Sequence, residues 1–110
     1  RGIQAEEMAI ALLRSRGHRI LHYNLRKGRT QIDIVSEKGA RLYVVEVKYR
    51  RYRSDIPEEL LSWAQRERIL VLGNYLMAQE GLKELSFLLV HYYGDYSDPR
   101  IFPLNLAKVR

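Results

Sequence analysis

Two acids and a lysine interrupt an otherwise apolar stretch of this chain. Asp33 lies within QIDIV, and Glu46 and Lys48 lie within VVEVK. A charge inside a strand-like apolar run is costly to desolvate unless it is paired, exposed or bound to a metal. Two carboxylates suit a hard divalent cation such as Mg²⁺, which can polarise a phosphate and lower the pKa of a bound water. The spacing therefore predicts a metal site for phosphate chemistry, with Lys48 close enough to act on whatever the cation holds.

Two predicted strands position these side chains. Apolar residues alternate with polar ones over 30–36 and 41–49, and EKGA joins the two segments, with Gly39 able to supply a positive φ. A hairpin that turns symmetrically about Lys38 and Gly39 places Asp33 opposite Val44. In a strand, successive side chains point to opposite faces.

The predicted register puts the acids on one face of the hairpin. Gln31 then lies opposite Glu46, and Asp33 and Glu46 are diagonal neighbours roughly 7–8 Å apart, close enough to converge on one cation. One face is expected to carry Gln31, Asp33, Val44, Glu46 and Lys48, and the other, apolar face Ile32, Ile34, Tyr43, Val45 and Val47.

The same residues also fit a structural role. Glu46 and Lys48 can form an ordinary ion pair on an exposed sheet, with Asp33 an acid near a strand end. An acid followed at some distance by Glu-x-Lys is common by chance. The consistent placement inside two apolar strands supports the catalytic interpretation, and both interpretations stay open at this point.

A third acid comes from a predicted N-terminal helix over 3–16, whose apolar residues recur at helical spacing. Glu6 shares a helical face with Ala9, Ile10 and Leu13, so it borders the buried stripe and can point at the sheet. The alternative is an N-terminal acid that interacts favourably with the helix dipole.

The remaining segments complete an α/β (α+β) domain. We predict a strand over 18–26, a helix capped by Ser54 or Asp55 that runs to about Gln79, and a strand over 85–93, with a last short strand or turn over 100–109. The order is α-β-β-β-α-β with a tail, a mixed β-sheet flanked by helices. Residues 1–110 show no linker or repeat, so we expect a single domain.

Composition limits the function classes. The net charge is +6, which favours an anionic partner, with nucleic acid first and an anionic membrane surface second. The chain has no cysteine, which excludes disulfides, Cys-ligated zinc and thiol nucleophiles and is typical of a cytoplasmic protein. No apolar run is long enough to span a bilayer, and the N-terminal segment lacks a signal-peptide core, so we expect no membrane association.

Two basic segments flank the acids and predict a nucleic-acid interface. Arginines in such segments can neutralise backbone phosphates, and tyrosines can stack on unpaired bases. A solvated loop is the alternative for the second segment. The expected nucleic-acid-binding residues are Arg26, Lys27 and Arg29 before Asp33, and Tyr49, Arg50, Arg51 and Arg53 after Lys48.

The order of three segments resembles the YraN-type uncharacterised family of predicted endonucleases, distant relatives of archaeal Holliday-junction resolvases in the PD-(D/E)xK nuclease superfamily. The segments are AEEMAIALLRSRGHRIL, NLRKGRTQIDIV and LYVVEVKYR. The resemblance implies a restriction-endonuclease-like fold and a homodimer. It also implies that the substrate is DNA, including branched DNA. It also implies these roles: Asp33 and Glu46 as ligands of Mg²⁺ or Mn²⁺, the Val47 carbonyl as a further ligand, Lys48 as catalytic lysine and Glu6 as auxiliary acid.

Some positions depart from that family's pattern. Gln31 stands where the family has a glutamate before Ile-Asp, Leu88 where its last core strand has an aspartate, and Gln65-Arg66 where it has Lys-Gln. These changes affect substrate positioning, so the alternative is a non-catalytic nucleic-acid-binding module that retains the nuclease fold. A third interpretation, a structural or partner-binding domain, predicts no salt-sensitive binding of nucleic acid.

Overall fold

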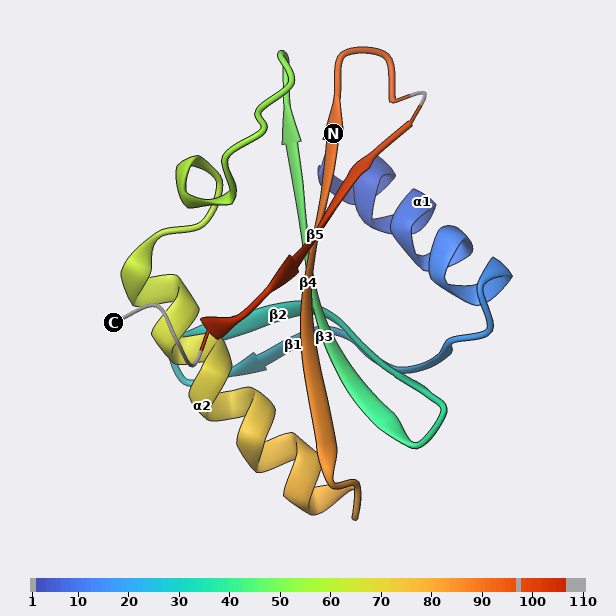
Figure 1. Ribbon diagram of the computed structural model, residues 1–110, viewed down its shortest axis with the longest axis vertical. Helices are drawn as coiled ribbons and strands as arrows, with labels where there is room; N and C mark the ends of the chain where they lie inside the picture. The colour runs from blue at the N-terminus through green and yellow to red at the C-terminus, as the bar shows by residue number, and fades with distance from the viewer. Residues whose placement is uncertain (1, 97, 107–110) are drawn as a thin grey trace.

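Five strands form one mixed sheet with a helix on each side (Figure 1). The structure is a computed structural model that describes residues 2–96 and 98–106. The elements in chain order are α1 (Gly2–Ser15), β1 (Arg19–Lys27), β2 (Thr30–Lys38), β3 (Arg41–Arg50), the 3₁₀ turn η1 (Pro57–Glu59), α2 (Trp63–Gln79), β4 (Glu84–Tyr93) and β5 (Arg100–Leu104).

The strands lie in the sheet in chain order, β1-β2-β3-β4-β5. Only β3 and β4 pair in parallel, because α2 carries the chain back between them, and the other three neighbouring pairs are antiparallel. This architecture confirms the predicted mixed sheet flanked by helices and is consistent with a restriction-endonuclease-like fold. The tail adds β5 to the predicted order, and the predicted positions 107–109 lie outside the described residues.

Each face of the sheet packs against one helix. The two helices lie on opposite sides of the long strands β3 and β4 (Figure 1). The core on the α2 side contains Ile32, Val35, Leu42, Val44, Leu61, Ile69, Leu72, Leu76, Phe87 and Leu106. The core on the α1 side contains Ala5, Ala9, Leu13, Ile34, Val45, Val47, Val90 and Tyr92. Both faces of the β2–β3 hairpin are therefore covered, and neither is the open polar face of the alternative interpretation.

The predicted register of the β2–β3 hairpin is wrong by two residues. Lys38 pairs with Arg41, so the turn consists of Gly39 and Ala40, both with positive φ, 59° and 62°. Two such residues form the tight turn that matches the twist of antiparallel strands. Val44 therefore lies opposite Val35 rather than Asp33. A shift of two keeps each side chain on its face, so the acids still meet, and by continuing the register Asp33 comes to lie opposite Glu46 instead of diagonal to it.

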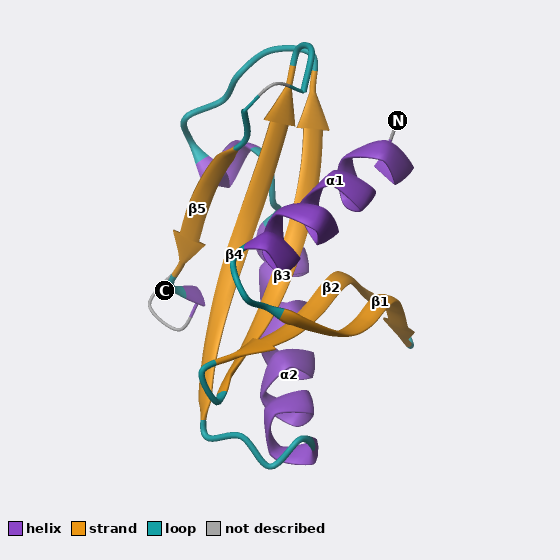
Figure 2. Ribbon diagram, turned by 90° about the vertical axis from the view of Figure 1, so that its right-hand side faces the viewer, coloured by secondary structure: helices purple, strands orange, loops and turns teal. Residues whose placement is uncertain are grey.

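The β1–β2 ribbon bends sharply beside Asp33. Asn24, whose place in the β1–β2 register is opposite Asp33, has a positive φ of 53° within a strand, a conformation that asparagine tolerates better than most residues. Ile32 and Ile34 consequently pack into different cores, which corrects the prediction that both face the same side. The bend turns β1 and the start of β2 away from β3 (Figure 2).

The second helix begins later than predicted. Residues 57–59 form only the short turn η1, and Ser62, not Ser54 or Asp55, caps α2 by accepting a hydrogen bond from the Gln65 N–H at 3.2 Å. Gly73 does not interrupt α2. It lies where the helix approaches the sheet closely, since a Cβ there would stand 3.1 Å from the Phe87 ring and 3.3 Å from Val44.

Neither α1 nor α2, the helices of the described residues, combines the length and apolar character needed to cross a membrane.

Candidate active site

The candidate site lies where β2 separates from β3. Backbone pairing between these strands ends at Ile34 and Val45, although β2 begins at Thr30 and β3 continues to Arg50. Buried backbone N–H groups beyond that point need other acceptors.

The two acids supply those acceptors. The Asp33 carboxylate accepts a hydrogen bond from the Val47 N–H at 2.7 Å, and the Glu46 carboxylate accepts a longer one from the Asp33 N–H at 3.4 Å. The side chains of the acids thus bridge the opening that the bend creates. Their positions follow from the backbone and do not depend on the rotamers of an exposed surface.

Burial makes both acids unusually hard to ionise. Glu46 is only 2% exposed, and Asp33 is half-buried. Desolvation raises the pKa of Asp33 to about 6, against the lowering effect of its hydrogen bond from Val47. The pKa of Glu46 is raised well above its ordinary value, first by burial and then by the neighbouring charge of Asp33. Two buried, mutually repelling carboxylates are stabilised as anions by a bound cation.

Glu6 and Lys48 influence this pair from either side. Glu6, half-buried on α1, raises the pKa of Asp33 further, and its charge also raises the pKa of Glu46. Lys48, half-buried on β3, lowers the pKa of both acids. Within the described part of the chain, however, Lys48 forms no ion pair shorter than 4 Å. The fold therefore brings together Glu6, Asp33, Glu46 and Lys48, as the sequence predicts, but leaves the buried negative charge incompletely neutralised.

The available oxygen atoms suit a hard divalent cation. Asp33 and Glu46 offer carboxylates, and the Val47 carbonyl lies on the strand between Glu46 and Lys48. Across residues 2–96 and 98–106, no three Asp, Glu or His side chains form a group that could hold a metal by themselves. Glu6 is therefore a neighbour of the pair and not a third ligand in this geometry. Mg²⁺ usually retains several waters and needs only one or two protein carboxylates together with substrate phosphate.

The first basic segment lies at the end of β1 and in the turn to β2. Arg26 donates a hydrogen bond to the Gln31 amide oxygen at 2.9 Å, and the Lys27 ammonium lies 5.4 Å from the centre of the Tyr75 ring. Arg29 is exposed in the turn. This segment thus extends from the neighbourhood of Asp33 to the outer surface of α2.

The second basic segment leaves the end of β3. Arg50 and Arg51 are exposed, whereas Arg53 forms an ion pair with Asp55 at 2.8 Å. Tyr49 is less available for a base than predicted. Its ring stacks on Tyr96 with centroids 4.7 Å apart, and its hydroxyl donates to the Gly94 carbonyl at 2.9 Å. Of this segment, Arg50 and Arg51 are the residues best placed to meet a phosphate.

Sequence reasoning missed the role of His91. This fully buried histidine pairs with Lys48 in the parallel β3–β4 ladder. Its Nε2 accepts the Ser54 N–H at 3.0 Å, which leaves Nδ1 to donate to the Lys48 carbonyl at 3.3 Å. Burial lowers the pKa of His91, which keeps the ring neutral in this role. His91 thereby fixes the backbone of Lys48 and the following loop. Only the register of the parallel strands, which the sequence does not encode locally, reveals this contact.

A family model covers most of this site. The model of the uncharacterised protein family UPF0102 matches residues 5–92. The chain belongs to this family. The matched UPF0102 segment contains Glu6, Asp33, Glu46 and Lys48 and ends before β5.

Relatives of known sequence support the assignment to UPF0102. A UPF0102 protein of Parvibaculum lavamentivorans is 40% identical over 78 residues, which cover 67% of this chain and 59% of the relative. One of Granulibacter bethesdensis is 37% identical over 78 residues, or 71% of this chain and 49% of the relative. One of Caldicellulosiruptor saccharolyticus is 27% identical over 110 residues, or 97% of this chain and 92% of the relative. The UPF0102 chain thus spans about half of the second relative and nearly all of the third.

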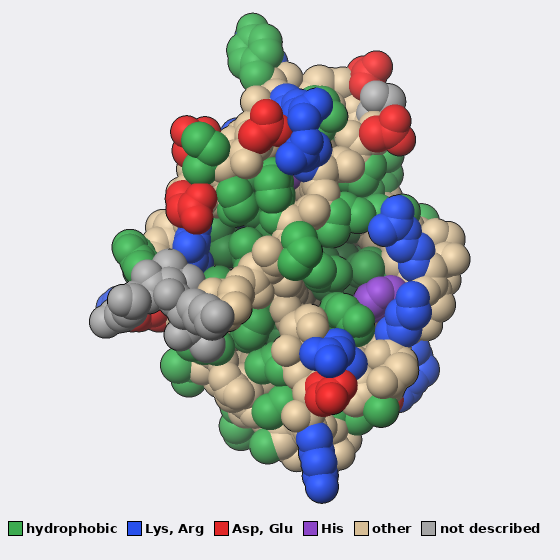
Figure 3. All heavy atoms as spheres, viewed as in Figure 1, with side chains coloured by type: hydrophobic (Ala, Val, Ile, Leu, Met, Phe, Trp, Pro, Cys, Tyr) green, Lys and Arg blue, Asp and Glu red, His purple; other side chains and the backbone are tan. Residues whose placement is uncertain are grey.

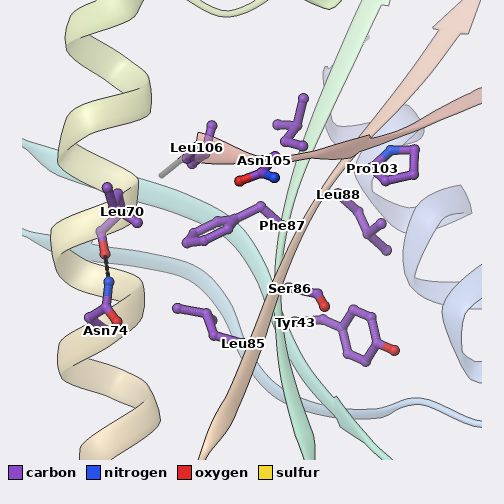
Figure 4. Close-up of a pocket in the computed structure, with 11 residues that line it drawn as sticks. Tyr43, Leu70, Asn74, Leu85, Ser86, Phe87, Leu88, Pro103, Asn105 and Leu106 are labelled. Atoms are coloured by element: carbon purple, nitrogen blue, oxygen red, sulfur yellow. Dashed lines mark hydrogen bonds between the residues drawn. The ribbon is translucent and has the colours of Figure 1, made fainter. Parts of the chain in front are cut away.

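The cavity on the β5 face of this UPF0102 chain is separate from the acids. Apolar side chains gather over the centre of that face (Figure 3), where a cavity of 540 Å³ lies between β4, β5 and α2. Leu85, Phe87 and Leu106 line it with other mostly apolar residues, and Asn74 is held by the Leu70 carbonyl at 2.9 Å (Figure 4). It contains no acid or base suited to catalysis, so we place the candidate chemistry at Asp33 and Glu46.

Proposed function

We propose that this UPF0102 protein is a divalent-metal-dependent endonuclease that hydrolyses phosphodiester bonds of nucleic acid, with DNA, including branched DNA, as the expected substrate. One observation carries the proposal: Asp33 and Glu46 are held side by side in the opened β2–β3 ladder, buried, with raised pKa values and no cation paired with either acid among the described residues.

In this proposal Asp33, Glu46 and the Val47 carbonyl bind Mg²⁺ or Mn²⁺. When bound, the cation polarises the scissile phosphate and makes water a stronger nucleophile. The contribution of the chain is to hold the oxygen ligands rigidly, because the backbone N–H groups of Asp33 and Val47 fix both carboxylates. The low exposure of Glu46 also excludes bulk water, which strengthens electrostatic interactions there.

Lys48 has a separate role from the acids. Its ammonium is close enough to lower the pKa of both carboxylates, yet it is not bound to either within 4 Å. It is therefore available to orient the attacking water and to stabilise the negative charge that develops on the phosphate. Glu6 acts as an auxiliary acid whose nearby carboxyl group favours the protonated form of Asp33.

The basic segments support binding of a polyanion. Arg26, Lys27 and Arg29 lie at the end of β1 and in the turn to β2, whereas Arg50 ends β3 and Arg51 follows it. Together with the net charge of +6, they favour nucleic acid over a small phosphate ester, because each neutralised phosphate adds sequence-independent affinity.

A cleavage assay tests the proposal. Labelled linear, flapped, four-way and single-stranded DNA, and RNA, are incubated with Mg²⁺, Mn²⁺ or chelator. Wild type is compared with Asp33→Asn, Glu46→Gln and a matched control, Glu37→Gln, which removes an acid of β2 that is ion-paired with Arg19. We expect metal-dependent cleavage that both site variants lose and the control retains. Cleavage that survives in both site variants would refute the assignment.

A specific observation favours one alternative, a nucleic-acid-binding module that retains the fold without catalysis. Only two acids form the core of the site, and Gln31 and Leu88 occupy positions where the resembled nucleases carry further acids. This module would bind DNA in a salt-sensitive way, equally well in wild type, Asp33→Asn and Glu46→Gln, and would cut none of the substrates.

A further inference from the structure

A surface groove on α2 combines apolar and cationic side chains. Its volume is 560 Å³, and its apolar lining consists of Val71, Leu72 and Tyr75. Val71 is 72% exposed and Tyr75 is 48% exposed, a high exposure for adjacent apolar positions on one helix. Lys27 and Arg68 stand at the rim of the groove. Such a surface needs a partner that offers both an apolar face and negative charge.

A second, polar pocket adjoins this groove. It has a volume of 100 Å³ and is lined by Arg29 and Gln31 from the β1–β2 ribbon and by Gln65 and Arg68 from α2. Arg68 lines both hollows, as does Thr30, so the two form one continuous surface. We call this surface the α2 track and define it by Lys27, Arg29, Arg68, Val71 and Tyr75.

The charge of the α2 track is predominantly positive. Lys27, Arg29 and Arg68 outnumber Glu67, the acid among the lining residues. In the part of the chain that the structure describes, neither Arg29 nor Arg68 forms an ion pair within 4 Å. Their charge is therefore available to an anionic partner. A second α2 helix has few acidic residues and would leave this charge without a partner.

The α2 track and the candidate site meet in β2. Gln31, which lines the polar pocket, stands two residues before Asp33 in β2. Its side chain is held by Arg26 at 2.9 Å and by Asn24 at 3.4 Å, the asparagine at the bend of the ribbon. A chain of phosphates that reaches Asp33 can therefore continue over Gln31 to Arg29 and Arg68.

The apolar part of the track offers an aromatic ring on which a base could stack. Stacking on an aromatic ring requires a free base face, which a continuous duplex does not offer, and it is tolerant of sequence. The Tyr75 ring is oriented by Lys27, 5.4 Å from its centre, and by a hydrogen bond of 3.4 Å between its hydroxyl and Gln79. It is thus a half-exposed aromatic surface beside cationic side chains.

We propose that the α2 track binds an unpaired strand of nucleic acid, with a base against Tyr75 and Val71 and phosphates against Arg29 and Arg68. The inference rests on the proposed nuclease function, since the same strand would enter the site at Asp33. It specifies the substrate class as nucleic acid with an unpaired segment next to the position of cleavage.

Fluorescence anisotropy in chelator tests this inference, because binding is then measured without cleavage. The probes are a labelled single-stranded DNA of about 12 nucleotides, RNA of the same sequence and a blunt duplex. Tyr75→Leu keeps an apolar side chain but removes the ring, and Tyr75→Phe keeps the ring. Arg68→Gln removes a charge of the track, and Arg14→Gln removes an exposed charge from α1 as a matched control.

We expect Tyr75→Leu to weaken single-strand binding about tenfold and to leave blunt-duplex binding unchanged. Arg68→Gln should reduce the slope of log K against log salt by about 1. Tyr75→Phe and Arg14→Gln should bind single strands like wild type. Unchanged single-strand binding by Tyr75→Leu, or an equal loss on the duplex, would overturn the inference. So would sedimentation showing a dimer that Tyr75→Leu dissociates, because the groove would then be an interface between copies.

The outcomes separate this inference from the proposed function. Tyr75-dependent strand binding without cleavage by wild type supports the α2 track and contradicts the nuclease proposal. Asp33-dependent cleavage with Tyr75-independent strand binding supports the nuclease and contradicts the track.

Discussion

The Asp33 carboxylate accepts the Val47 N–H at 2.7 Å at the point where the β2–β3 ladder opens. The side chain of a candidate metal ligand thus also replaces a backbone acceptor of the sheet. Because Val47 follows Glu46 in β3, this single bond also fixes the second acid. A mutation of Asp33 that removes the acceptor would disturb the strand, whereas Asp33→Asn retains an oxygen that can accept the same bond.

The acid pair should make the metal-free protein less stable as the pH rises. Asp33 has a folded-state pKa of about 6, above its ordinary value of 3.8. The folded state therefore binds this proton more tightly, and the free energy of unfolding should fall as pH rises from about 4 through about 6. The shift corresponds to on the order of 3 kcal/mol. Glu46, whose pKa is also raised, acts in the same direction.

Denaturant unfolding in chelator checks this pH dependence. Asp33→Asn should be more stable than wild type at about pH 7 but not at about pH 4, since only the ionised acid is destabilising. The Glu37→Gln control should follow the wild-type curve. A wild-type stability that rises over this interval, or an Asp33→Asn variant with the same pH slope, would contradict the assigned burial.

Much of this site can be predicted from the sequence, because it depends on the alternation of side chains along strands and on helical spacing. Side chains alternate between the two faces of a strand. A hairpin register that differs from the predicted one by an even number of residues therefore leaves Asp33 and Glu46 on the same face. The two-residue error in the turn therefore left the pairing of the acids intact. Similarly, the helical spacing of Glu6 relative to Ala9 and Leu13 predicts its approach to the sheet.

The rest of the site depends on contacts between distant segments. The bend at Asn24 combines an uncommon backbone conformation with pairing to β2, and only the folded ribbon shows that it separates Ile32 from Ile34. The contact of His91 with Lys48 requires the parallel register across α2. The late start of α2 follows from its cap, which Ser62 forms rather than Ser54.

Lys48→Met should abolish most cleavage while preserving metal binding. The substitution keeps an unbranched side chain, one atom shorter, but removes the cation that faces the developing negative charge. Single-turnover cleavage at saturating Mn²⁺ should fall by about 100-fold or more, whereas Mn²⁺ affinity should be retained. Equal losses of cleavage and Mn²⁺ affinity would show that Lys48 organises the metal site instead of acting on the substrate.

Arg51→Gln should weaken DNA binding through its charge alone. Arg51 is exposed and forms no ion pair with a described residue. Because we expect it to contact one phosphate, its loss should reduce the slope of log K against log salt by about 1. Arg53→Gln should have a smaller effect, because Arg53 is already paired with Asp55 at 2.8 Å. Titrations at several salt concentrations compare the two variants. A larger effect of Arg53→Gln would mean that the ion pair opens on binding.

Gly73→Ala should destabilise the fold although alanine favours helices. The added Cβ would stand 3.1 Å from Phe87 and 3.3 Å from Val44, so these buried side chains or α2 must shift. Overpacking of this kind costs about 1–3 kcal/mol, which exceeds the gain in helix propensity of about 1 kcal/mol. Thermal unfolding should show a lower midpoint than for Asn74→Ala, the exposed neighbouring position. A midpoint above wild type would contradict the tight approach of helix and sheet.

The central claim is that the two acids in the opened β2–β3 ladder bind a divalent cation. Calorimetric titration of Mn²⁺ into the free protein near neutral pH tests it most directly, with wild type, Asp33→Asn, Glu46→Gln and Glu37→Gln compared under the same conditions. Our account predicts saturable Mn²⁺ binding by wild type and Glu37→Gln, and its loss in Asp33→Asn and Glu46→Gln. Equal Mn²⁺ binding by all four proteins, or none by wild type, would contradict it.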